Sequence, residues 1–107
     1  MATITLQIPD VLAQLPTKER DSLLQAGLWQ AITARREQLK SEIMEASEQI
    51  KAFSTRYGLS FTHFEAELLP NLDSWQAHED YNDWFFWQSV LEEKQNLLAH
   101  LPSVGFI

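Results

Sequence analysis

The sequence predicts a mainly α protein of one domain, residues 1–107, with a single N-terminal β-strand. Three observations lead to this fold class. A heptad pattern of apolar residues runs through the first half of the chain. Three Gly and four Pro are too few for an all-β chain, whereas the frequent Gln, Glu, Leu and Ala favour helix. A length of 107 residues fits one domain. We therefore expect a long heptad-patterned helix, a short helix and a long C-terminal helix, in a chain that forms a homodimer.

The first element is a strand and turn arm over residues 1–16, in which apolar and polar residues alternate before Pro9. One face of the strand would pair with a neighbour through its apolar residues: Ile4, Leu6 and Ile8. A single strand cannot satisfy its own backbone hydrogen-bonding groups. It therefore pairs with its copy in a dimer or with another protein, or it is extended and docked.

The second element is a long helix over residues 17–57, capped by Thr17 and ended by Gly58. From Trp29 to Tyr57, apolar residues together with Arg36 recur at alternating spacings of three and four. This heptad seam needs a second helix beside it, from this chain or from a second copy. The candidate dimer seam comprises Ile32, Arg36, Leu39, Ile43, Ile50 and Phe53.

Arg36 is the one charged member of the heptad seam. A buried charge without a partner is costly. Either Arg36 extends along its apolar stem to reach water, or a carboxylate from a second chain pairs with it and fixes the register.

A short helix is predicted over residues 60–69, and an apolar tail over residues 102–107 docks or frays. A capping box of Thr62 and Glu65 begins the short helix, with Ser60 as the alternative cap.

The last helix, residues 73–101, contains four consecutive aromatic residues. At 100° per residue, Trp84, Phe86 and Trp87 fall on one apolar face and are predicted as core. Phe85 falls outside that face. We therefore expect Phe85 to be exposed.

The net charge of −7 is concentrated in the C-terminal half. Residues 1–57 hold seven bases and seven acids, whereas residues 58–107 hold one base, eight acids and nine of the twelve aromatics. Such a surface suits a basic protein better than nucleic acid, because phosphate binding needs positive charge. The alternative is an acidic, solvated face that aids solubility. The candidate partner-binding residues are Tyr81, Phe85, Asp80, Asp83 and Glu92.

The sequence lacks the motifs of an enzyme or a cofactor site. It has no cysteine, no phosphate-binding glycine loop and no second His after His78 to complete a zinc-protease motif. His63 and Glu67 are neighbours on a helix, but two ligands are a weak metal signal. We expect no catalytic, metal or cofactor site. The lack of cysteine and of any apolar run of ~20 residues fits a cytoplasmic protein without a membrane span.

Two stretches carry a resemblance to a known class of protein: TITLQIPDVLAQL at residues 3–15, and RYGLSFTHFEAEL at residues 56–68 before the acidic, Trp-rich last helix. They resemble small antitoxins of bacterial and archaeal type II toxin–antitoxin pairs. The resemblance implies a protein that binds and neutralises a partner toxin, often a ribonuclease with a basic cleft.

The same resemblance leaves other functions open. The first stretch resembles the opening of ribbon-helix-helix antitoxins, whose paired strands read DNA; here the reading face would be Thr3, Thr5 and Gln7. The chain departs from that domain, because one very long helix stands where two ordinary ones are expected. The leading prediction is an antitoxin-like inhibitor. The alternatives are a structural helical dimer or scaffold, and a DNA-binding repressor.

Overall fold

The computed structural model describes residue 5 and residues 7–102, and most of these residues are helical. The prediction of a mainly helical chain with one long helix is confirmed. The elements in order are α1 (Asp10–Ala13), α2 (Thr17–Tyr57), α3 (Phe61–His63), the π-helical turn η1 (Phe64–Leu68), the 3₁₀ turn η2 (Leu69–Asn71) and α4 (Trp75–His100).

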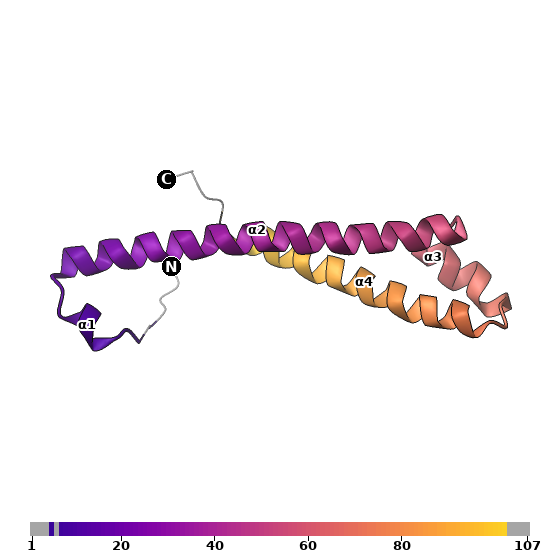
Figure 1. Ribbon diagram of the computed structural model, residues 1–107, viewed down its shortest axis with the longest axis horizontal. Coiled ribbons are helices and arrows are strands. Elements are labelled where there is room, and N and C mark those ends of the chain that lie inside the picture. Colours follow the sequence, from indigo (N-terminus) through magenta and orange to yellow (C-terminus); the bar gives the residue numbers. More distant parts are fainter. Residues whose placement is uncertain (1–4, 6, 103–107) are drawn as a thin grey trace.

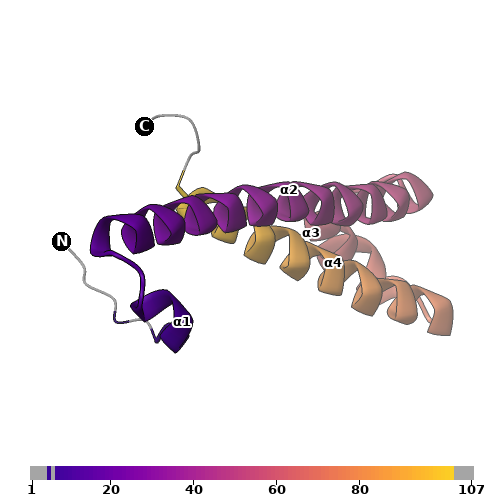
Figure 2. The same cartoon turned by 60° about the vertical axis from the view of Figure 1, so that its left-hand side comes forward.

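The two long helices, α2 and α4, form an antiparallel pair (Figure 1). At 1.5 Å rise per residue, the 41 residues of α2 span about 60 Å, which accounts for most of the 68 Å length of the molecule. The short elements α3, η1 and η2 close one end of the pair. Figure 2 shows the N-terminal part of α2 extending past the end of α4.

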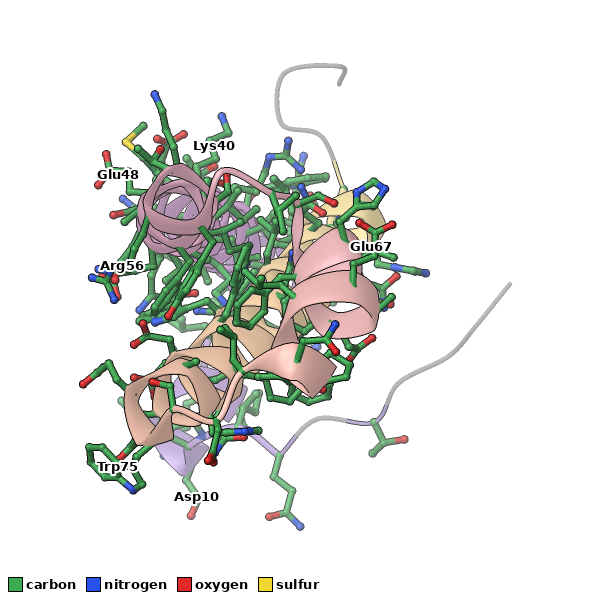
Figure 3. All side chains as sticks on the ribbon, turned by 90° about the vertical axis from the view of Figure 1, so that its right-hand side faces the viewer. Asp10, Lys40, Glu48, Arg56, Glu67 and Trp75 are labelled. Atoms are coloured by element: carbon green, nitrogen blue, oxygen red, sulfur yellow. The ribbon has the colours of Figure 1, made fainter. Side chains whose placement is uncertain are left out.

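The heptad seam packs largely within the chain. Leu39, Ala46 and Phe53, spaced seven residues apart, are the three buried residues of α2. Two of them, Leu39 and Phe53, were predicted in a dimer seam; α4 of the same chain covers that part of α2 instead. In the view along the molecule, Lys40 and Glu48 project from α2 away from α4 (Figure 3).

An aromatic core lies where the end of α2, the short elements and the start of α4 meet. Its buried members are Phe53, Phe64, Ala77 and Trp84. Gly58 reverses the chain there, because its φ of 67° is the left-handed conformation that ends a helix.

The caps differ in part from the predicted ones. Ser60 caps α3 by accepting from the His63 amide, as the alternative prediction had it. Ser74 caps α4 by accepting from the Ala77 amide. Thr17 is the first residue of α2, and no side-chain hydrogen bond caps that helix.

The predicted N-terminal strand is not found. Residues 5 and 7–9 form no strand, and Ile8 lies half-buried in irregular chain before α1. Ile4 and Leu6 lie outside the described residues. A strand needs a neighbouring strand to pair its backbone groups. The alternating pattern alone is therefore not enough to form a strand in this chain.

Arg36 takes a third role that the sequence did not indicate. Its Nη1 donates to the carbonyl oxygen of Leu101 at 3.3 Å and to that of Pro102 at 3.5 Å. Leu101 is the C-cap residue of α4, and Pro102 follows it. Arg36 therefore holds the end of α4 against α2 within one chain.

Candidate functional site

Trp84 of α4 lies at the centre of the aromatic core, directly beneath the candidate site. Its side chain is fully buried, stacked on Phe53 at 5.7 Å and close to Phe64 at 5.2 Å between ring centroids. Tyr57 packs on the same group, 4.5 Å from Phe64. Because rings from three elements meet at Trp84, the rotation of α4 is fixed, and this sets which residues of α4 face outward.

Three rings lie at the surface beside this core. Phe61 of α3 stacks on Tyr81 of α4 at 5.6 Å, with the ring planes 14° apart. Phe85, one helical turn after Tyr81, lies 6.2 Å from Phe61 and 6.3 Å from Tyr81. Phe85 remains 53% exposed, so the predicted exposure of this side chain is observed.

A groove of about 440 Å³ runs from these rings along α4. We call it the α3/α4 groove, and it is lined by Phe61, Thr62, Phe85, Gln88, Ser89, Leu91, Glu92 and Gln95. A second hollow of about 470 Å³ continues along the helix, lined by Ser89, Glu92, Glu93 and Asn96. The groove is therefore aromatic at one end and acidic at the other.

No base of α4 neutralises the acidic end. Lys94 is the only Lys or Arg after residue 57, and it is 23% exposed with its Nζ 3.5 Å from Glu42 of α2. Lys94 is thus held on another side of α4 from Glu92. The charges of Glu92 and Glu93 are left for solvent or for a ligand.

Glu65 of η1 adds an acid beside the aromatic end. The Tyr81 hydroxyl donates to Glu65 Oε2 at 2.6 Å, and this hydrogen bond raises the pKa of Tyr81. The bond ties the ring of Tyr81 to the short elements. As a result, Phe61, which lines the groove, is held in place by its stack on Tyr81.

Asp80, predicted to contact a partner, instead lies in the core at 4% exposure. Its Oδ2 accepts from Arg56 at 2.8 Å and from the Tyr57 hydroxyl at 2.5 Å, and its Oδ1 accepts from Gln76 at 2.9 Å. Burial raises the pKa of Asp80, but these hydrogen bonds outweigh it and hold the pKa below its ordinary value. Asp80 therefore stabilises the fold and does not face the groove.

Of the other predicted partner-binding residues, three lie in or beside the groove and one lies outside it. Tyr81, Phe85 and Glu92 come together in or beside the groove. Asp83 is exposed but lies outside it, because it follows Tyr81 by only two residues and so points to another side of the helix.

Phe86 corrects the helical-wheel prediction. It was predicted as core with Trp84 and Trp87, yet it is 56% exposed and contacts the edge of Trp87 at 5.1 Å. The buried arc of α4 is centred instead on Ala77, Asp80 and Trp84. A wheel treats every large apolar residue as equally buried, whereas one neighbouring helix covers only a narrow arc.

Phe61 is the aromatic groove residue that was not among the predicted partner-binding residues. Its spacing placed it with the apolar residues of the short helix, and nothing local indicates a contact with Tyr81 twenty residues later. A signal for the rest of the groove was available: Tyr81, Phe85, Gln88 and Glu92 recur at spacings of four, three and four on one helix face.

Within residues 5 and 7–102, no group of three or more His, Cys, Asp or Glu is placed to hold a metal ion. None of the described helices is long and apolar enough to cross a membrane. Comparison with protein-family models, curated proteins and solved structures finds no match for this chain.

Proposed function

We propose that this protein is a binding module that captures a basic partner protein in the α3/α4 groove, and that it acts as an antitoxin-like inhibitor of that partner. The observation that carries the proposal is the exposure of Phe85 beside the stacked Phe61–Tyr81 pair, next to the unneutralised acids Glu92 and Glu93.

The aromatic end supplies the binding energy. Exposed aromatic side chains that become buried in a complex dominate the affinity of many interfaces. The rings of Phe61 and Tyr81 are already stacked in the free chain, so little conformational entropy is lost when a partner covers them.

The acidic end of the groove determines the specificity for a basic partner. Glu92 lines both hollows, and Glu93 lies next to it. The matching segment carries an apolar side chain for the rings and a Lys or Arg for the acids. A nucleic-acid phosphate would be repelled by the same acids.

Charge reversal in the native host tests this proposal. Tagged wild-type, Glu92→Lys and Glu48→Lys chains would be compared for the amount of one co-purifying protein, identified by mass spectrometry. Glu48 is the matched control, because it is an exposed acid that projects from α2 away from α4 (Figure 3), and both variants change the net charge equally. We expect Glu92→Lys to lose the partner and Glu48→Lys to keep it. Equal retention by both variants would contradict the proposal.

A second function, as a helical scaffold that associates with its own copy, is favoured by one observation. The N-terminal part of α2 extends past α4 (Figures 1 and 2). This surface is separate from the α3/α4 groove, so self-association and partner capture are compatible.

A further inference from the structure

Helix α4, which packs along α2, does not reach the N-terminal part of α2. Arg36 holds the C-terminal end of α4 through the carbonyls of Leu101 and Pro102. Residues 17–35 of α2 continue beyond that point (Figures 1 and 2). Among the residues that the structure describes, only the short helix α1 lies near the start of this section, which we call the α2 extension, and no long helix runs along it (Figures 1 and 2).

The α2 extension continues the apolar face that α4 covers further along. At 100° per residue, Leu24, Leu28 and Ile32 fall within about 60° of the direction of buried Leu39. Leu28 is 59% exposed, although it points in nearly the same direction as Leu39. A helix of this length gains most of its stability from packing of its apolar face. Leu24 and Ile32 are half-buried, so Leu28 is the exposed centre of this face, and a further packing partner would stabilise the α2 extension.

We propose that a second copy of the chain occupies it, with the two α2 extensions packed antiparallel and Leu28 at the twofold axis. In this register Leu24 of each chain meets Ile32 of the other. An isologous contact of this kind closes after two chains.

Charge complementarity selects the antiparallel orientation. The same register brings Asp21 of each chain opposite Arg35 of the other. A parallel pair in register would place Asp21 against Asp21 and Arg35 against Arg35, which is unfavourable. Within the chain, Asp21 lies 3.8 Å from Arg20 and Arg35 lies 3.8 Å from Glu42, both long for ion pairs. Arg35 Nη1 also donates to Gln38 at 2.9 Å, so Arg35 would exchange this exposed hydrogen bond for the contact with Asp21.

The proposed contact between the two α2 extensions begins where the contact between α2 and α4 of the same chain ends. α4 runs antiparallel to α2 and stops near Arg36, and the second α2 extension would follow the same line from there. In the same register Arg20 of the second copy comes level with Arg36, which already binds the carbonyls at the end of α4, so Asp21–Arg35 is the attractive charge pair of the contact and Arg20–Arg36 opposes it. The 19 residues of each extension span about 28 Å. The interface is therefore small, and we expect a weak, concentration-dependent dimer.

The orientation can be tested cleanly because the natural chain has no cysteine. Leu28→Cys, Leu24→Cys and Ile32→Cys chains would be oxidised separately, and the last two also as a mixture. We expect a covalent dimer from Leu28→Cys alone and a mixed dimer from Leu24→Cys with Ile32→Cys. Self-linked dimers of Leu24→Cys and of Ile32→Cys, as efficient as those of Leu28→Cys, would show a parallel pair and overturn the proposal.

Sedimentation tests association without cross-linking. We expect wild type to pass from monomer to dimer with rising concentration, and Leu28→Asp to remain a monomer with its helical circular dichroism largely kept. Met44→Asp is the matched control, since Met44 is 64% exposed on another face of α2, and it should dimerise like wild type. Asp21→Arg should weaken the dimer about tenfold, and adding Arg35→Asp should restore it. A wild-type chain that stays monomeric at several hundred micromolar, or that dimerises unchanged as Leu28→Asp, would overturn the proposal.

Discussion

Arg56 of α2 and Asp80 of α4 form an ion pair of 2.8 Å that joins the two long helices beside the aromatic core. The two partners differ sharply in environment, because the side chain of Asp80 is 5% exposed and that of Arg56 is 55% exposed. The Tyr57 hydroxyl and Gln76 complete the ligands of the carboxylate. Asp80 is thus a buried charge whose cost is offset by three donors.

Loss of this carboxylate should destabilise the fold. Asp80→Ala leaves the Tyr57 hydroxyl without its acceptor, and we expect a loss of about 2 kcal/mol in the free energy of unfolding, measured by urea denaturation. Asp83→Ala is the control, because Asp83 is an exposed acid on the same helix and should change stability by less than about 0.5 kcal/mol. Equal effects of the two variants would show that the network does not stabilise the hairpin.

The same network predicts how stability depends on pH. The folded pKa of Asp80 lies below its ordinary value of 3.8, so the contribution of the ionised carboxylate is fully present above about pH 4. It is lost as the pH falls through the lower, folded pKa. Urea denaturation from pH 6 to pH 2.5 should therefore show a fall in the unfolding free energy that is shallower in Asp80→Asn. Parallel curves for wild type and Asp80→Asn would rule out this assignment.

Gly27, inside α2, and Gly58, which follows its last residue, should respond in opposite directions to the same substitution. At both Gly27 and Gly58, an added Cβ meets nothing within 4 Å. Gly27 lies inside α2, so Gly27→Ala should stabilise by up to about 1 kcal/mol. Gly58 has a φ of 67°, and Gly58→Ala should destabilise by about 1 kcal/mol. Urea denaturation followed by circular dichroism checks both, and a change of the same sign in the two variants would contradict this reading.

The sequence predicts the long helix well because its signals are local. The heptad spacings define one apolar face, and Gly58 marks the end of the helix at Tyr57. The identity of the covering helix is a different question, since the same spacings suit a partner from either chain. Contacts between residues far apart in the sequence hold α4 there, among them Arg36 with Leu101, 65 residues away, and Arg56 with Asp80.

The candidate site was predictable only in part. The exposure of Phe85 follows from its angle on the helix, and Glu92 follows from the same face. The burial of Asp80 was missed because three acids near the start of α4 look alike in sequence. Only Asp80 meets Arg56 and Tyr57, and that meeting depends on how α2 and α4 pack. The second wall of the groove, Phe61, also depends on that packing.

Two neighbouring phenylalanines provide the most direct test of the central proposal, that the α3/α4 groove binds a basic protein. Phe85 and Phe86 are 53% and 56% exposed, but only Phe85 lines the groove. With the captured partner purified, calorimetric titration would give its affinity for wild type, Phe85→Ala and Phe86→Ala. We predict that Phe85→Ala weakens binding at least about tenfold and that Phe86→Ala leaves it within about twofold. Full affinity of Phe85→Ala, or an equal loss in both variants, would contradict the account.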